Sequence, residues 1–195
     1  MLFRSVLNVG GNNKRIALPP EFAGWDHVLL DIDPAVKPDV LCDARALDSL
    51  APAQFDAVYC SHNLEHYYRH DVRRVLAGFR HVLKPEGFTL VRVPNIREVL
   101  QIAVERDLDL EDVLYNSTAG PITVHDVIYG FGAEIERSGS DFFAHKTGFS
   151  SAALTRYLTA AGFANIYLGE AGLDIVAYGF SREPDAATRQ ALKLG

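Results

Sequence analysis

The sequence predicts a doubly wound α/β fold built on a mostly parallel sheet. Short apolar runs recur along the first half of the chain, and they are nearly continuous rather than alternating. Such runs are typical of strands that are covered on both faces. Glycines, carboxylates or imidazoles come directly after four of these runs. Because the carboxyl ends of parallel strands form one edge, this placement indicates a nucleotide-type ligand there.

The first five strands are expected at the apolar runs themselves, over residues 5–9, 27–31, 40–42, 55–60 and 88–93. The connection between the first two strands is short for a parallel crossover. It has only sixteen residues, 12–27, with Pro19 and Pro20 in its middle. The two prolines leave room for about one turn of helix. One face of the sheet is therefore expected to be thinly covered at this point.

Apolar residues at three- and four-residue spacing predict the helices. Between the fourth and fifth strands the spacing is carried by Val72, Val75, Leu76, Phe79, Val82 and Leu83. Residues 84–87, Lys-Pro-Glu-Gly, should end that helix. A later helix should begin after Ser150, an N-cap residue, and stop at Gly162. Two final strands over 166–168 and 175–180 lie close enough in sequence to pair antiparallel, which gives seven strands in all.

The 195 residues suffice for one sizeable core and are too few for two comfortable domains. We expect a single domain over residues 1–181, in which residues 96–148 form a helical insert that would serve as a lid. One apolar stripe of the insert comprises Val124, Val127, Ile128, Phe131 and Ile135. This stripe would cover sheet surface within the chain or pair with a second copy, so we expect a homodimer. Residues 182–195 should form a polar tail or a terminal helix.

Composition excludes several classes of partner. The net charge is −6, which argues against a nucleic-acid-binding surface. No apolar stretch approaches membrane-spanning length, and no signal peptide precedes the first strand. The two cysteines, Cys42 and Cys60, lie in apolar runs and are expected to be buried, reduced thiols. We therefore expect a cytoplasmic protein with no nucleic-acid or membrane partner.

The loops after the first three strands suit the parts of a nucleoside. Gly10-Gly11-Asn12 would let backbone pass close beneath a ligand, although two glycines also suit a plain tight turn. Asp31 ends the second strand about twenty residues later, where a carboxylate can accept hydrogen bonds from both ribose hydroxyls. Asp33 is better explained as a turn residue before Pro34. Asp43-Ala44 would supply a carboxylate and a backbone amide to an adenine ring.

At this point the sequence resembles a known family, the class I S-adenosylmethionine-dependent methyltransferases. The segments that carry the resemblance are LNVGGN (7–12), LDID (30–33), DA (43–44), FDAVYCSHNLEH (55–66) and VLKPEG (82–87). Later segments are similar to a bacterial subgroup of predicted methyltransferases, some of them from surface-polysaccharide gene clusters. These are IYG (128–130), HKTGF (145–149) and AGF (161–163). The resemblance runs through most of residues 5–180.

The resemblance implies a Rossmann-like methyltransferase fold and S-adenosylmethionine as cofactor. The residues it places at the cofactor are Asn8, Gly10, Gly11, Asn12, Asp31, Ile32, Asp43, Ala44, Ser61, His62 and Asn63. It also places Glu65 and His66 at the start of the following helix. The chain departs from the family pattern at the first turn. Asn8 replaces the usual acidic residue, and Asn12 and Lys14 stand where later glycines would be.

The activity implied is methyl transfer to an acceptor that the sequence does not identify, such as a hydroxyl of a small molecule or glycan. A hydroxyl must lose a proton, and an imidazole of near-neutral pKa can take it. His62 and His145 are the candidates for this catalytic role. His125 and Tyr129, in the insert, are equally well explained as structural residues. The altered glycine turn favours an alternative, a non-catalytic binding or scaffold protein that kept the fold.

A rival motif overlaps the fourth segment. His62-Asn63-Leu64-Glu65-His66 spells H-x-x-E-H, the signature of inverted zinc peptidases. On a helix the two histidines would share a face and could hold zinc. The motif starts directly after the fourth strand, however, where a helix is only beginning, and no third carboxylate ligand follows. We therefore expect no metal site at this motif.

Overall fold

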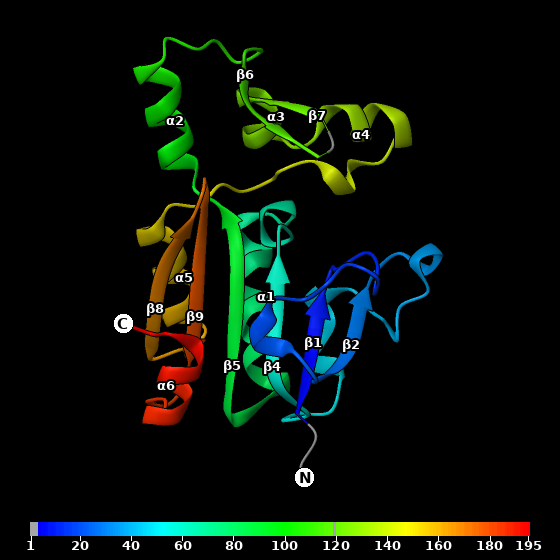
Figure 1. Cartoon of the computed structure of the whole chain (residues 1–195). Coiled ribbons are helices and arrows are strands. Elements are labelled where there is room, and N and C mark those ends of the chain that lie inside the picture. The colour runs from blue at the N-terminus through cyan, green and yellow to red at the C-terminus, as the bar shows by residue number, and fades with distance from the viewer. Residues whose placement is uncertain (1–3, 119) are drawn as a thin grey trace.

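The computed structural model describes residues 4–118 and 120–195, and its centre is a seven-stranded sheet. The strand order is β3-β2-β1-β4-β5-β9-β8, and all pairings are parallel except those of β9 with β5 and β8. The bounds are β1 Ser5–Val9, β2 Asp26–Asp31, β3 Val40–Leu41, β4 Phe55–Ser61, β5 Leu83–Pro94, β8 Asn165–Ala171 and β9 Asp174–Phe180. The predicted fold class, with an antiparallel last strand, is confirmed. Figure 1 shows the arrowheads of β1, β2, β4 and β5 pointing toward a smaller lobe above the sheet.

One face of the sheet is covered by α1 (Arg69–Val82), α5 (Ser151–Ala160) and the 3-10 segment η3 (Ala44–Ser49). The apolar spacing of α1 buries Val72, Val75, Leu76, Phe79 and Val82 completely, as predicted. Ser150 caps α5, because its Oγ accepts a hydrogen bond from the backbone amide of Ala153 at 3.3 Å. Helix α1 ends at Val82, just before residues 84–87 that were expected to end it, and these residues already belong to β5. Lys84, within this early part of β5, pairs with Asp56 at 2.8 Å.

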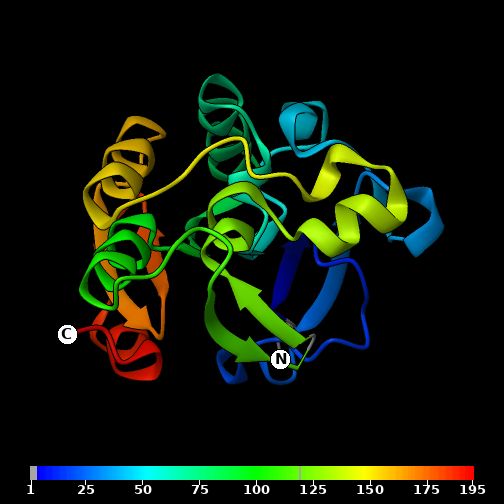
Figure 2. The same cartoon turned by 90° about the horizontal axis from the view of Figure 1, so that it is seen from above.

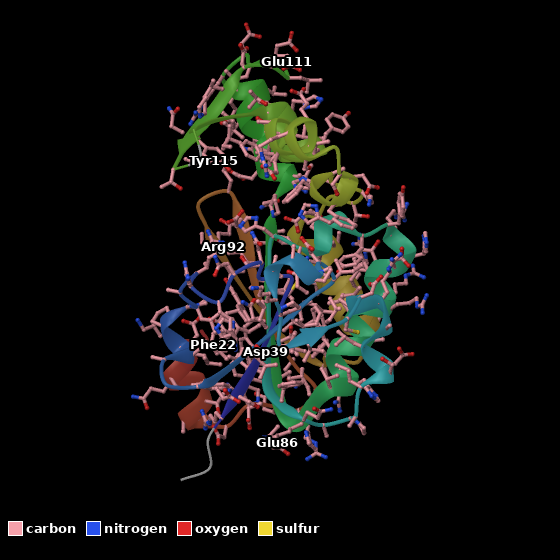
Figure 3. The ribbon with its side chains drawn as sticks, turned by 90° about the vertical axis from the view of Figure 1, so that its right-hand side faces the viewer. Phe22, Asp39, Glu86, Arg92, Glu111 and Tyr115 are labelled. Carbon is pink, nitrogen blue, oxygen red and sulfur yellow. The ribbon has the colours of Figure 1, made fainter. Side chains whose placement is uncertain are left out.

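The opposite face is covered by short elements and aromatic side chains. The first crossover contains only one 3-10 turn, η1 (Pro20–Phe22), as the two prolines predict. Phe22 stacks on Phe88 with ring centroids 6.0 Å apart, and Trp25 meets both rings edge-on. Residues 186–192 form helix α6 (Ala186–Leu192), whose Leu192 packs on the same cluster. Figure 3 shows the labelled Phe22 and the helix α6 on the same side of the sheet, away from α1. The thin face is thus filled from both ends of the chain.

The insert is a small lobe with its own core. It contains α2 (Ile96–Glu105), the hairpin β6 (Val113–Ser117) and β7 (Gly120–Thr123), α3 (Val124–Tyr129) and α4 (Gly132–Ser138). The hairpin was not predicted. The predicted apolar stripe is split, because Gly130 separates α3 from α4 with a φ of +106°. Val124 and Val127 are buried against α2. Seen from above, the lobe lies over the carboxyl edge of the sheet (Figure 2).

The longest helix that the structure describes, α1, has 14 residues, whereas a membrane-spanning helix needs about 20 apolar residues. Within residues 4–118 and 120–195, no helix is long and apolar enough to cross a membrane.

Candidate active site

A cavity of about 720 Å³ lies between the carboxyl edge of the sheet and the insert. Its floor consists of the segments that follow β1, β2, β3 and β4, the last of them reaching into the first turn of α1. These contribute Gly10, Asn12, Asp31, Ile32, Asp33, Val36, Asp43, Arg45, His62, Asn63, His66, Tyr67, Tyr68 and Asp71. Its roof is supplied by α4 and the segment after it, through Glu134, Arg137, Ser138, Ser140, Phe142, Phe143 and Lys146. The edge predicted to bind a nucleotide-type ligand is therefore hollow and covered by the insert.

In the glycine turn after β1, the backbone at Gly10 lies closer to Asn63 than any residue with a Cβ atom would allow. Gly10 has a φ of +68°, and a Cβ built on it would lie 2.1 Å from Nδ2 of Asn63. Its backbone amide donates to the carbonyl of Leu30 at 2.8 Å, which joins the turn to β2. Asn12 also adopts a positive φ, +56°, which asparagine tolerates better than most residues. The turn thus brings backbone, rather than side chains, to the floor of the cavity.

Asp31 lies at the centre of the floor. Its Oδ2 accepts the backbone amide of Asn12 at 3.2 Å, and its Oδ1 accepts the amide of Asp33 at 3.0 Å. A carboxylate has about four lone-pair positions, so two remain for a ligand, one on each oxygen. Ile32, next in the chain, is 44% exposed and lines the same cavity. A carboxylate with free acceptors beside an exposed aliphatic side chain fits the diol and base of a nucleoside.

Two other acidic residues near this end are committed to local contacts. Asp33 caps the 3-10 turn η2 (Pro34–Val36) by accepting the amide of Ala35 at 2.8 Å. Asp43 caps η3 and is held by Arg45, whose Nη2 lies 2.6 Å from Oδ2. Burial raises the pKa of Asp43, but its hydrogen bonds with Arg45 outweigh this and keep the pKa below its usual value. Asp43 therefore reaches the cavity as one half of an ion pair.

Four predicted cofactor residues do not line the cavity: Asn8, Gly11, Ala44 and Ser61. Asn8 is almost completely buried beneath the turn, because a Cβ at Gly11 would lie 2.1 Å from its Nδ2. The same amide lies 3.1 Å from Nε2 of His27. Burial lowers the pKa of His27, so its imidazole is neutral and can accept this hydrogen bond. Asn8, which stands where the family pattern has an acidic residue, therefore packs beneath the glycine turn.

His62 is placed at the cavity but is not suited to the role of base. Its Nε2 lies 3.2 Å from Oδ2 of Asp174, and its Nδ1 lies 3.6 Å from Oε1 of Glu65. Burial lowers the pKa of His62, but these two carboxylates outweigh burial and raise it to about 9. Asp174 is also paired with Arg92 at 2.6 Å, at the upper end of β5 below the insert (Figure 3). His62 is therefore a cation at neutral pH, held between two acids.

The second predicted base, His145, lies beside the cavity rather than in its wall. Its Nδ1 is 2.9 Å from the carbonyl oxygen of Val127, and its ring meets that of His66 with centroids 5.0 Å apart. Burial lowers the pKa of His145, and the negative charge of Glu65 only partly opposes this. His66 itself lines the cavity, with its Nδ1 3.2 Å from the carbonyl oxygen of Ala144. Nδ1 of each imidazole thus donates a hydrogen bond to a backbone carbonyl oxygen, which leaves Nε2 as the acceptor atom of each ring.

The H-x-x-E-H segment is not helical through both histidines. His62 has a φ of +48°, Leu64–His66 form a 3-10 turn, and α1 begins only at Arg69. Glu65 and His66 therefore precede the helix that they were expected to start. The helical face that an inverted zinc peptidase would need is not formed.

Other residues expected near the site lie outside it, and several cavity residues were not predicted. His125 and Tyr129 stack on each other with centroids 4.8 Å apart and do not line the cavity. The unpredicted residues include Tyr68, Phe142 and Lys146. The Nζ of Lys146 lies 5.6 Å from the ring centre of Tyr68. The only sequence signal for them was their place in the insert or directly before α1.

The comparisons with known proteins agree with this geometry. Residues 7–91 match a family described as a methyltransferase domain. The sequence matches no curated protein. The structure of an S-adenosylmethionine-dependent methyltransferase from Archaeoglobus fulgidus is 16% identical, with a TM-score of 0.54. The alignment spans 91% of this chain and 86% of that one. A Pyrococcus horikoshii protein is 14% identical, with a TM-score of 0.59 and coverages of 92% and 82%.

A third similar structure carries a cofactor product. The Burkholderia thailandensis 1,6-didemethyltoxoflavin-N1-methyltransferase, solved with bound 1,6-didemethyltoxoflavin and S-adenosylhomocysteine, is 18% identical, with a TM-score of 0.52 and coverages of 94% of this chain and 72% of that one. At such identities the structures establish the fold, while the match over 7–91 covers the strands whose loops form the cavity floor. The free acceptors of Asp31 and the open turn at Gly10 fit a nucleoside cofactor. Residues 7–91 therefore match a methyltransferase domain and the chain has the Rossmann-like methyltransferase fold, which together imply S-adenosylmethionine as the cofactor.

Proposed function

We propose that this methyltransferase acts on a hydroxyl group of a small molecule or glycan. The observation that carries the proposal is the composition of the cavity beyond Asp31. That end is lined by the aromatic side chains of Tyr68, Phe142 and Phe143, together with Lys146 and His66. Aromatic faces pack well on the apolar faces of sugar rings, while charged and imidazole groups hydrogen-bond hydroxyls. Glycan acceptors also agree with the resemblance to proteins from polysaccharide gene clusters.

When bound, S-adenosylmethionine supplies an already activated methyl group, so the protein must align the acceptor and exclude water. Asp31 would hold the ribose, and the backbone at Gly10 would lie under the cofactor. The roof formed by α4 and Phe142 would exclude water from the acceptor end. The insert, which differs most from a plain doubly wound fold, would select the acceptor.

A hydroxyl acceptor releases a proton, and the acceptor end has groups that can receive it. His62 is unsuitable, because its pKa of about 9 keeps it protonated at neutral pH. Glu65, His66 and His145 each offer an atom within 4.8 Å of the others, and His66 reaches the cavity. We therefore assign proton removal to this group rather than to His62.

The test is transfer of an isotopically labelled methyl group to a panel of hydroxyl-bearing sugars and phenols, with product detection by mass spectrometry. Replacement of His66 by alanine should lower kcat at least tenfold, since proton removal typically contributes 10²–10⁴-fold. His125→Ala is the matched control, because His125 does not line the cavity. A methylated nitrogen or carbon in place of oxygen would contradict the hydroxyl assignment, as would full activity of His66→Ala.

The second candidate is a non-catalytic binding or scaffold protein. It is favoured by Asn8, which supports the turn where the family pattern has an acid. A protein of this kind would bind S-adenosylhomocysteine without transferring a methyl group to any acceptor.

We also propose that the protein works in the cytoplasm, supported by Cys42 and Cys60, both of which are free thiols.

A further inference from the structure

We propose that Glu65, His66 and His145 form a binding site for a divalent transition-metal cation, with zinc as the best match. The three residues offer one carboxylate oxygen and two imidazole nitrogens, all within 4.8 Å of one another. In a tetrahedral zinc site with ligands about 2.1 Å from the ion, two ligands lie ~3.4 Å apart. The side chains would therefore need to close by up to about 1.4 Å.

Both imidazoles are oriented as metal ligands usually are. Nδ1 of His66 lies 3.2 Å from the carbonyl oxygen of Ala144, and Nδ1 of His145 lies 2.9 Å from that of Val127. A carbonyl oxygen only accepts, so each Nδ1 must carry the proton. The lone pair of each ring is then on Nε2. A hydrogen bond from the other ring nitrogen to a backbone carbonyl is the usual support of a metal-binding histidine, because it fixes tautomer and orientation.

The carboxylate of Glu65 provides an independent observation. Glu65 is only 2% exposed, and neither of its side-chain oxygens has a hydrogen-bond partner. Glu65 has an ion-pair contact with His62, whose Nδ1 is 3.6 Å from Oε1 and which also pairs with Asp174. A buried carboxylate without hydrogen bonds is costly unless a cation compensates it. A metal ion bound by Glu65 would supply that compensation.

Backbone contacts hold the two halves of the site together. The carbonyl oxygen of Glu65 accepts the amide of Lys146 at 2.7 Å and the amide of Thr147 at 3.1 Å. These bonds fix the segment that carries His145 alongside the turn that carries Glu65 and His66. The ligands therefore come from two segments about 80 residues apart in sequence, which are joined by main-chain hydrogen bonds rather than by the metal alone.

The donor set selects the class of metal. Two imidazole nitrogens and one carboxylate suit zinc and its transition-metal neighbours, whereas magnesium and calcium prefer oxygen ligands only. Three protein ligands leave a fourth position open, as in catalytic zinc sites. Because His66 lines the cavity, that position adjoins its acceptor end. With zinc bound, the two imidazoles would be ligands rather than free bases, and a hydroxyl at the open position would lose its proton more readily because the metal lowers its pKa. These three ligands differ from those that the H-x-x-E-H motif would supply. His62 of that motif pairs with Asp174, and His145 provides the second imidazole in its place.

Zinc binding can be measured without cofactor or acceptor, so the result does not depend on the proposed function. Whole protein freed of metal by dialysis against EDTA would be titrated with Zn²⁺ in a calorimeter. We expect about one zinc ion per chain, with affinity reduced at least tenfold in His66→Ala and in His145→Ala. His125→Ala, which alters an imidazole of the same insert outside the group, should bind zinc as the wild type does.

A second measurement avoids variants that fold poorly. In the wild-type protein, histidine ring ¹⁵N spectra should show Zn²⁺ shifting Nε2 of His66 and His145 while those of His70 and His125 stay unchanged. The proposal is overturned if the wild type takes up no zinc, or if zinc shifts other histidines instead. It is equally overturned if both folded alanine variants bind zinc as tightly as the wild type, which would leave Glu65 solely as the charge partner of His62.

Discussion

Gly10 and Asn63 meet where the first strand turns toward the cavity, and this contact decides which residue can occupy position 10. The positive φ of Gly10 alone would cost an alanine about 1–2 kcal/mol. The overlap of its Cβ with Asn63 adds a steric cost, because the gap is only 2.1 Å. Gly24 offers a matched comparison, since it has a φ of +79° and no heavy atom within 4 Å of its Cβ position.

Gly10→Ala should therefore lower the melting temperature more than Gly24→Ala, and it should weaken S-adenosylhomocysteine binding as Asn63 is displaced. Thermal unfolding followed by circular dichroism and a binding titration would check both effects. Equal destabilisation by the two substitutions would show that backbone strain alone matters at position 10.

Asp31→Ala removes the carboxylate assigned to the ribose. A lost hydrogen bond to a charged group is worth roughly 1.5–3 kcal/mol, so affinity for S-adenosylhomocysteine should fall about ten- to a hundredfold. The control is Asp48→Ala, which makes the same change of charge at an exposed position outside the cavity. Unchanged calorimetric affinity in a folded Asp31→Ala protein would refute the assignment.

Residue-level prediction placed Asp31 correctly, because it ends a strand and the structure has it lining the cavity. Its role at the ribose stays a prediction. Prediction was wrong about the start of the helix at Glu65, since α1 begins at Arg69. The grouping of Glu65 with His145 could not be predicted, because it depends on a tertiary contact through Lys146 that leaves no periodic signal.

At the level of elements, Asp126 joins α3 to α4, the helix of the cavity roof. Its Oδ2 accepts both the amide and the hydroxyl of Thr123, at 3.0 and 2.8 Å, in a capping box at the start of α3. Its Oδ1 accepts the amide of Gly132, the first residue of α4, at 3.0 Å. Burial raises the pKa of Asp126, but these hydrogen bonds outweigh it and hold the pKa below the usual value.

Because the folded pKa of Asp126 lies below its unfolded value, its contribution to stability is present above the unfolded pKa. That contribution is lost as the pH falls through the folded pKa, below about 4. At neutral pH, Asp126→Asn should accelerate hydrogen exchange of the Thr123 and Gly132 amides while amides of β1 stay protected. The same amides in the wild type should lose protection progressively as the pH falls below about 4. Uniform loss across the sheet in Asp126→Asn would contradict a local role.

The elements themselves were predictable in proportion to their burial. The inner strands could be read from continuous apolar runs, and Val6, Leu7 and Val9 of β1 are indeed buried. The β6–β7 hairpin gives no such signal, because only Leu114 is buried in β6. The stripe expected to form one helix surface was divided at Gly130, where a Cβ would lie 2.1 Å from the carbonyl oxygen of Phe143. That restriction comes from the roof segment and is invisible in the local sequence.

For the molecule as a whole, one group of exposed apolar side chains belongs to the insert. It comprises Leu100, Val104, Leu110, Val113 and Tyr115. They lie on α2, on β6 and between them, at the top of the molecule (Figure 1). The sheet face below, expected to need a partner, is covered by Phe22, Trp25 and α6. We propose that a homodimer forms through α2 and β6 instead.

Light scattering should accordingly give a mass near twice the chain mass of 21.5 kDa at micromolar concentration. Val104 is 82% exposed, and Val104→Glu should return the mass to that of a monomer. Leu168→Glu, at another exposed apolar position on the edge strand β8, should leave the dimer intact. A monomeric wild type would refute the dimer.

The central claim is that the carboxyl edge of this sheet binds S-adenosylmethionine despite the altered glycine turn. Calorimetric titration of the whole wild-type protein with S-adenosylhomocysteine tests it most directly. The structure predicts one bound molecule per chain, because a single cavity among the described residues combines the free acceptors of Asp31 with the open turn at Gly10. Absence of saturable binding by a folded protein would contradict the claim.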